Sequence, residues 1–319
     1  MGRLLALATL IAIPAVSAHG WVSGVTVNGK HYPGADPSWH LRSVGKMPSA
    51  VWYSDNYGQH NPVFSKDVGT NNVACHVNAT PGSLVIPVKP GDTLELTWET
   101  PEGGPWRPTH EGPVLDYMAS CEGDCRDASV EDLKFFKIAE KGMLQSPHMT
   151  ADGVGTFGRW GTDILRDANN TWSVTIPSTL SGPHVLRTEL FALMGAGHEG
   201  HAQMFPQCIN LDIQNSESAS TSADPCEAGV DCRLGRELYK ETDPGIDISI
   251  HQKIAKYHCP GPALWQGAKR VATGDPQDGD AKTSDSTARS SRNWFSHWKG
   301  APMYGGHVGR FRRPHGARL

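Results

Sequence analysis

The sequence has no long apolar run beyond its first eighteen residues, and it has little excess charge. No later run approaches the roughly 20 residues of a membrane-spanning helix, so we expect no membrane partner. The 29 Lys and Arg against 33 Asp and Glu give a formal net charge of −4, without the basic excess that marks nucleic-acid binding. Alternating amphipathic helices are also missing, whereas Gly (35) and Pro (23) are abundant. These features predict an all-β, turn-rich fold.

The first eighteen residues have the pattern of a secretory signal peptide. Arg3 precedes an apolar run over Leu4–Ile13, and Val16-Ser17-Ala18 places small side chains where signal peptidase cleaves. Cleavage after Ala18 would make His19 the new amino terminus. Loss of Arg3 would change the formal net charge from −4 to −5. We therefore expect a secreted, extracellular protein.

Short apolar or alternating runs between turn residues predict many strands. Turn pairs such as Asn28-Gly29 and Pro90-Gly91 separate them. The expected strands are Trp21–Val27, Ser83–Val88, Thr93–Trp98, Val114–Met118, Lys134–Ile138, Trp172–Ile176, His184–Leu193 and Cys208–Ile213. Such a pattern favours a β-sandwich. Two irregular stretches, Tyr32–Asn72 and Leu144–Asn170, are too long for hairpin loops and are expected to build a functional surface.

The charge of the chain changes towards its carboxyl end. Residues 268–319 hold ten Lys or Arg and four Asp, a net of +6, which leaves −11 for residues 19–267. We expect this basic tail to be disordered. A Ser/Thr-rich bridge, Asn215–Ala223, resembles a linker, but the patterned segment Leu234–Trp265 after it is assigned to the same domain. The predicted organisation is a signal peptide (1–18), one domain (19–267) and a tail (268–319).

Seven cysteines in a secreted chain indicate disulfides. Cys121 and Cys125 favour a small disulfide loop over a zinc site, because no second thiol pair has metal-ligand spacing. The odd count leaves one thiol free or paired between chains. Two sequons place candidate glycosylation sites at Asn78 and Asn169.

His19 would carry two nitrogen ligands, its free α-amine and its imidazole, once the leader is removed. This pair suits copper, because Cu(II) favours tetragonal nitrogen ligation. A third ligand could come from His110, in Thr109-His110-Glu111-Gly112-Pro113, immediately before an expected strand. The alternatives are that histidine follows the cleavage site by coincidence and that His110 has a structural role.

Several motifs, in order along residues 19–267, resemble the fungal lytic polysaccharide monooxygenases of auxiliary activity family 9, formerly glycoside hydrolase family 61. The motifs are His19-Gly20-Trp21-Val22, Thr109–Cys121, Cys121–Cys125, Phe135–Ile138, Trp172–Pro177, Leu186-Arg187-Thr188-Glu189, Ala202–Cys208, Leu238–Gly245 and Pro260–Trp265.

The resemblance implies an immunoglobulin-like or fibronectin-III-like β-sandwich with long loops that form a flat substrate face. It implies one copper ion, held by the α-amine and Nδ1 of His19 and by Nε2 of His110. Two disulfides would be Cys75–Cys208 and Cys121–Cys125. Tyr239 falls where the family often has an aromatic on the substrate face, although packing of a late loop is an equal alternative.

Two departures from the family pattern concern the surroundings of the metal. Phe205 stands where the family usually has an axial tyrosine, and Thr188 stands for the histidine of the family's Arg-His-Glu segment. Gln203, the other usual donor near the copper, is retained, which makes it a candidate catalytic residue with His19 and His110. Because threonine cannot carry a proton near neutral pH, we hypothesise that His198 or His201 supplies an imidazole instead; the alternative is that both are ordinary surface-loop histidines.

The resemblance implies a monomeric, copper-dependent oxidoreductase that cleaves cellulose or a related β-linked glycan at C1, C4 or both. It would use O2 or H2O2 and electrons from an external reductant. A hydrolase is disfavoured, because Glu111 and Asp116 have no evident general-acid partner. The alternative is a protein that binds copper through the same histidines without cleaving glycans, for copper handling or host interaction. Phe205 and Thr188 favour this alternative.

Overall fold

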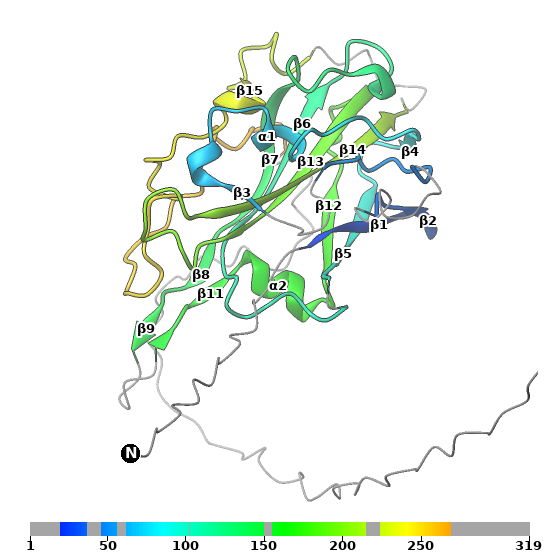
Figure 1. Ribbon diagram of the computed structural model, residues 1–319. Helices are drawn as coiled ribbons and strands as arrows, with labels where there is room; N and C mark the ends of the chain where they lie inside the picture. The colour runs from blue at the N-terminus through cyan, green and yellow to red at the C-terminus, as the bar shows by residue number, and fades with distance from the viewer. Residues whose placement is uncertain are drawn as a thin grey trace, which may run out of the picture. The chain divides into compact units, whose positions relative to one another are not determined.

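The computed structural model describes residues 20–36, 46–55, 62–101, 103–149, 155–214 and 224–268 (Figure 1). The chain divides into two units, residues 1–275 and 276–319. The predicted signal peptide, His19, the linker at 215–223 and the tail from residue 269 onward lie outside the described residues. The predicted domain boundaries therefore stay predictions.

Two β-sheets form the body of the first unit (Figure 1). The smaller sheet has the order β12-β5-β1-β2, and all its pairs are antiparallel. The larger, seven-stranded sheet has the order β15-β7-β6-β13-β14-β3, with β4 parallel to β14. The smaller sheet comprises β1 (Trp21–Val27), β2 (Lys30–Pro33), β5 (Thr93–Glu99) and β12 (Thr171–Thr175). The larger comprises β3 (Val63–Phe64), β4 (Ile86–Val88), β6 (Val114–Ser120), β7 (Lys134–Lys141), β13 (Gly182–Ala192), β14 (Gln203–Ile213) and β15 (Arg233–Leu234). The prediction of an all-β sandwich is confirmed.

Strands lie at the positions that alternating apolar residues and turn residues predict. β1 has its predicted bounds, because Asn28 (φ 51°) and Gly29 (φ 74°) both adopt the positive φ of a tight hairpin turn that pairs Val27 with Lys30. β14 begins five residues earlier than predicted, at Gln203. This extension brings Gln203 and Phe205 into the sheet.

The larger sheet is buried on both faces, because nearly every residue of β6, β13 and β14 is buried, polar residues included. Its inner face packs on the smaller sheet; this core includes Leu190 and Phe205. Its outer face is covered by α1 (Asn72–Cys75) and by segments that follow β14; this second core includes Phe191 and Tyr239. Successive residues of β13 therefore serve different cores.

Short helices and strands lie outside the two main sheets. They are η2 (Ser65–Asp67), α1 (Asn72–Cys75), η3 (Cys125–Asp127), β8 (Met143–Gln145), β9 (His148–Met149), β10 (Gly155–Thr156), β11 (Arg159–Trp160), α2 (Gly161–Asp167) and η4 (Gly235–Glu237). The long stretch predicted over Leu144–Asn170 contains most of β8 and all of β9, β10, β11 and α2. Figure 1 shows β8, β9 and β11 projecting from one end of the sandwich with α2 beside them.

Three disulfides cross-link the described residues. Cys75–Cys208 and Cys121–Cys125 are the pairs that the resemblance implied. Cys226–Cys232 is a third, and Cys259 is the remaining free thiol. Burial raises the pKa of Cys259 to about 12, so the thiolate is scarce near neutral pH. None of the helices in the described part of the chain is long and apolar enough to cross a membrane.

Candidate metal centre

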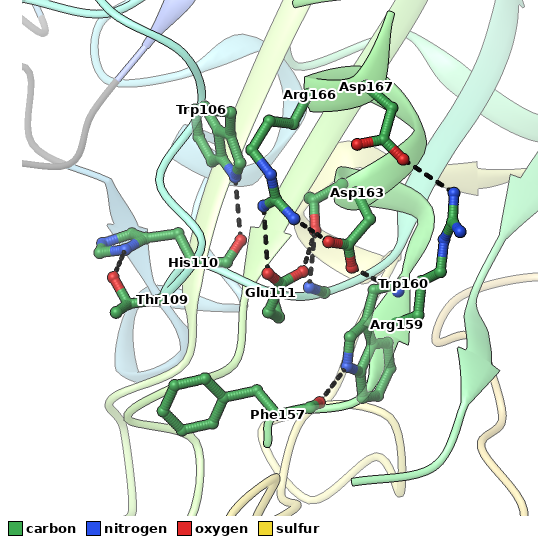
Figure 2. Close-up of polar contacts among 12 residues, drawn as sticks. Trp106, Thr109, His110, Glu111, Phe157, Arg159, Trp160, Asp163, Arg166 and Asp167 are labelled. Atoms are coloured by element: carbon green, nitrogen blue, oxygen red, sulfur yellow. Dashed lines mark hydrogen bonds and ion pairs between the residues drawn. The ribbon is translucent and has the colours of Figure 1, made fainter. Parts of the chain in front are cut away.

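His110 lies just before β6 and is fixed through both its backbone and its ring (Figure 2). Its N–H donates to the Arg107 carbonyl at 3.0 Å, and its own carbonyl accepts from Trp106 Nε1 at 2.9 Å. Its Nδ1 lies 3.0 Å from Thr109 Oγ1. Because Nδ1 is engaged by Thr109, Nε2 is the ring nitrogen suited to bind a metal. This agrees with the ligand atom that the family resemblance implies.

Trp106 connects His110 to two other parts of the site. Its ring meets the ring of His110 edge-on at 6.4 Å and that of Phe205 at 5.3 Å between centroids. A Cβ on Gly20 would lie 2.9 Å from Trp106 Cζ3 and 2.9 Å from the Glu99 carbonyl oxygen. Gly20 therefore packs directly on the indole, and it is the residue after His19. One buried tryptophan thus contacts both the His110 segment and the residue that follows His19.

Gln203 and Phe205 share one face of β14, because side chains alternate along a strand and the one residue between them points to the other face. Phe205 is fully buried and is opposite Leu190 in the sheet. Gln203 Oε1 is buried and has no hydrogen-bond partner among the described residues. A buried, unpaired amide oxygen is costly unless a bound group satisfies it. Gln203 together with His110 therefore fits a metal site with a bound ligand or water.

Glu111, next to His110, belongs to a buried cluster with α2 (Figure 2). Its carboxylate accepts from Arg166 Nη1 at 3.1 Å and from Thr162 Oγ1 at 3.2 Å. Burial and the neighbouring carboxylate of Asp163 raise the pKa of Glu111 to about 8, against the lowering effect of Arg166. The cluster thus combines two carboxyl groups with one guanidinium.

The structure contradicts the prediction that Thr188 neighbours the metal. Thr188 is opposite Asp116 in β6 and Gln207 in β14, whereas Gln203 is opposite Ala192. Four residues along a strand correspond to about 13 Å. Thr188 is fully buried in the middle of the sheet, so it cannot stand beside Gln203. Sequence analysis placed Thr188 near the metal with Gln203, whereas the register places these two residues at different levels of the sheet.

Met194 is the residue that the sheet register brings towards His110. The ladder continues beyond the end of β13, because Phe191 N donates to Pro113 O at 3.0 Å and Leu193 N to Glu111 O at 2.9 Å. The next residue on this extension, Met194, is therefore level with His110. The Met194 carbonyl lies 2.8 Å from His251 Nε2, which anchors the segment. Sequence analysis missed Met194, because its position emerges only from the pairing register.

The expectation that Tyr239 faces the substrate is also wrong. Its side chain is 4% exposed, and its hydroxyl donates to Glu189 Oε2 at 2.5 Å. The hydroxyl of Tyr117 lies 2.8 Å away, and Arg187 Nη1 lies at 3.3 Å. Tyr239 is part of the outer core, as the alternative of a packed late loop anticipated.

His198 and His201 lie on the loop between β13 and β14, both exposed, with ring centroids 6.1 Å apart. The backbone of His201 approaches Gly195, where a Cβ would lie 2.9 Å from the His201 carbonyl oxygen. This loop adjoins Met194, so a role for either imidazole near the metal stays a prediction. Asn78 and Asn169 are exposed, and their glycosylation likewise stays a prediction.

The fold and these residues point to a class: a β-sandwich with a candidate metal site around His110, near one end of its sheets. In the described part of the chain, no three His, Cys, Asp or Glu residues converge to hold a metal. His19, which directly precedes Gly20 and lies outside the described residues, remains the further ligand that the family resemblance implies.

Comparison with known proteins gives the family. The family model described as "Auxiliary Activity family 9 (formerly GH61)" matches residues 19–257. A relative from Botryotinia fuckeliana, AA9 family lytic polysaccharide monooxygenase I, is 38% identical over 82% of this chain and 90% of its own length. Lytic polysaccharide monooxygenase A from Thermoascus aurantiacus is 38% identical over 78% of this chain and its full length. The chain therefore belongs to auxiliary activity family 9.

Solved structures agree with this assignment. The extended catalytic domain of H. jecorina LPMO9A superposes with a TM-score of 0.66 at 33% identity, covering 85% of this chain and 97% of that one. Cel61B from Hypocrea jecorina superposes with a TM-score of 0.63 at 29% identity, covering 77% of this chain. Membership of the family indicates a copper-dependent oxidoreductase that acts on polysaccharide, and the enzymes of this family are secreted.

Proposed function

We propose that this protein is a secreted, copper-dependent monooxygenase that cleaves cellulose or a related β-linked glucan at C1, C4 or both. The oxidant is O2 or H2O2, and the electrons come from an external small molecule or electron-transfer protein. The observation that carries the proposal is the contact of Trp106 with both His110 and Gly20. That contact supports a shared site for the two histidines, which are 91 positions apart in the sequence.

The chain's own residues would hold one copper ion. His19 supplies its α-amine and Nδ1, and His110 supplies Nε2 while Thr109 orients its ring. Copper, when bound in this way, supplies one-electron redox chemistry with the oxidant. The family match that begins at His19 supports this ligand set, because the α-amine exists only if processing ends there.

Other residues would shape the surroundings of the ion. Gln203 presents a buried amide with an unsatisfied oxygen, suited to hydrogen-bond a ligand or water near the metal. Phe205 provides an apolar wall packed on Trp106 and would offer no oxygen atom to a bound ion. The chain would therefore contribute no phenol from this position.

The decisive experiment uses protein processed to begin at His19, loaded with copper and incubated with ascorbate and phosphoric-acid-swollen cellulose. Oxidised oligosaccharides, resolved by mass spectrometry as C1 or C4 products, are expected. Two matched variants, His110→Ala and a form with one extra alanine before His19, should lose them. Tight copper binding with no oxidised product on any β-glucan tested would instead establish the non-cleaving copper-binding alternative.

A further inference from the structure

The segment that carries His110 is held by helix α2 through backbone hydrogen bonds. Thr162 N donates to the Gly112 carbonyl at 3.2 Å, and Gly112 N donates to Thr162 Oγ1 at 3.1 Å. The Thr162 hydroxyl in turn donates to Glu111 Oε2 at 3.2 Å. A single threonine thus holds the two residues that follow His110.

Arg166, one turn along α2, completes the arrangement from the other side. Its Nη1 contacts Glu111 Oε1 at 3.1 Å, and its Nη2 pairs with Asp163. Asp163 Oδ2 accepts the Trp160 N–H at 2.8 Å, which caps the start of the helix. Figure 2 shows the guanidinium of Arg166 lying between the two carboxylates.

Helix α2 is itself anchored firmly to the sandwich. Gly161 N donates to the Gly142 carbonyl at 3.0 Å, and a Cβ on Gly161 would lie 2.4 Å from the Lys141 carbonyl oxygen. The helix therefore starts in direct contact with the end of β7. A support that rests on the main sheet can hold a neighbouring residue within a narrow range of positions.

Burial distinguishes this cluster from an ordinary surface ion pair. The side chain of Glu111 is 4% exposed and that of Arg166 is 20% exposed. On the same segment, Arg159 pairs with Asp167 at 2.8 Å, but those side chains are 52% and 59% exposed. Breaking a buried pair leaves an uncompensated group, whereas exposed pairs contribute little. Only the first pair can strongly constrain its surroundings.

We propose that Arg166 is a positioning residue for His110 and acts through Glu111. With its side chain held by Arg166 and Thr162 and its carbonyl held by Leu193 N at 2.9 Å, Glu111 fixes the backbone from which the His110 ring projects. The proposal rests on the proposed function, because it assumes that His110 is a copper ligand. It assigns to the long stretch Leu144–Asn170, which contains α2, a task in forming the metal centre.

The test compares copper-loaded Arg166→Leu and Glu111→Ala with the unchanged protein, all processed to begin at His19. The Cu(II) electron paramagnetic resonance spectrum should change, and the Kd for Cu(II) should rise about tenfold, as is common when groups that orient a ligand are lost. Glu111→Gln keeps a side-chain oxygen for Thr162 and Arg166, and should restore the spectrum. Arg159→Leu is the matched control; it removes the exposed pair and should leave spectrum and Kd unchanged.

The outcomes separate this proposal from the proposed function. An unchanged spectrum and Kd in folded Arg166→Leu would overturn the positioning role while leaving copper binding intact. If Arg166→Leu does not fold, Arg166→Gln carries the same comparison, with circular dichroism confirming the fold. Failure of the unchanged protein to bind copper would instead refute the proposed function.

Discussion

The two faces of the seven-stranded sheet accommodate buried polar groups differently. On the outer face, Arg187 and Glu189 are completely buried and form an ion pair at 2.8 Å. Arg187 also donates to the carbonyls of Val73 and Ala74, both at 2.7 Å in their shortest contacts. On the inner face, the carboxyl group of Asp116 forms no ion pair among the described residues; it lies opposite Thr188 and accepts from Trp172 Nε1 at 2.9 Å.

This difference shows why neighbouring residues of one motif have different tasks. Arg187, Thr188 and Glu189 are consecutive, yet alternation sends the threonine to the inner face and its neighbours to the outer face. The outer network stabilises the packing of Tyr239 and α1 on the sheet. The inner pair, Asp116 and Thr188, has a neutral hydrogen-bond partner, Trp172, in place of a guanidinium. Neither lies at the end of the sheet where His110 and Gln203 are found.

The largest expected effect concerns the outer network. Arg187→Met should lower the free energy of unfolding by about 3–5 kcal/mol, because Glu189 is left as an uncompensated buried carboxylate. Guanidinium denaturation measures this change. Adding Glu189→Gln to the variant should recover part of the loss, and a double variant no more stable than Arg187→Met would contradict this account.

The inner face should respond to pH. Burial raises the pKa of Asp116 from 3.8 to about 7, although Trp172 Nε1 donates to its Oδ2 at 2.9 Å. Between these values the folded state holds a proton that the unfolded state releases, so the stability contributed by Asp116 is complete below about pH 4 and is lost as pH rises through 7.

Asp116→Asn should therefore flatten the pH dependence of the melting temperature between pH 4 and 7. At pH 7 we expect it to be more stable than the unchanged protein, by on the order of 1 kcal/mol or more. If the melting temperatures of the two proteins change with pH in the same way across this range, Asp116 has an ordinary pKa.

A smaller effect is expected at Tyr239. Tyr239→Phe removes the hydroxyl that donates to Glu189, which should cost about 1–3 kcal/mol of stability. Because the ring is buried, the variant should bind cellulose as the unchanged protein does. A pull-down on insoluble cellulose, with protein concentrations matched for the folded fraction, checks this. Weakened binding would show that Tyr239 contributes to the substrate surface.

The last prediction concerns oxidative turnover, and the two substitutions in it should have the smallest effects on stability. Met194→His places an imidazole level with His110 and should change oxidative turnover up to about tenfold. Thr188→Val, in the middle of the sheet, should leave turnover unchanged. Oxidised oligosaccharide yield from copper-loaded protein measures both. If Thr188→Val alters turnover and Met194→His does not, the register argument for the metal surroundings fails.

Much of the fold could be predicted from the sequence, because strands are marked locally. The Asn28-Gly29 turn adopts two positive φ values, and this turn pair predicts the exact residue at which β1 ends. Helix α2 could not be predicted in the same way. Its seven residues have only a weak helical pattern of apolar residues. The residues that it contacts, Glu111, Gly112 and Lys141, all belong to other parts of the chain. Tertiary contacts, absent from a local pattern, stabilise it.

The sequence predicts candidate ligands for the site, and these stay predictions, but it does not show which residues surround them. His110 lies beside a strand start that the sequence marks, and the family motifs supplied its role. Thr188 and Met194 differ by only six positions, and no local pattern tells which of them reaches the end of the sheet. That distinction depends on the register between β13 and its neighbours, which is a property of the assembled sheet.

The disulfide Cys75–Cys208 has a consequence for the covalent topology of the metal centre. It joins residues 133 positions apart and so closes a ring that contains Trp106, His110, Arg166, Gln203 and Phe205. His19 lies outside this ring, at the proposed free chain end. The proposed copper ligands thus come from two topologically different parts of one molecule, a closed ring and an open end. Copper, when bound, would act as a second cross-link that fastens the open end to the ring.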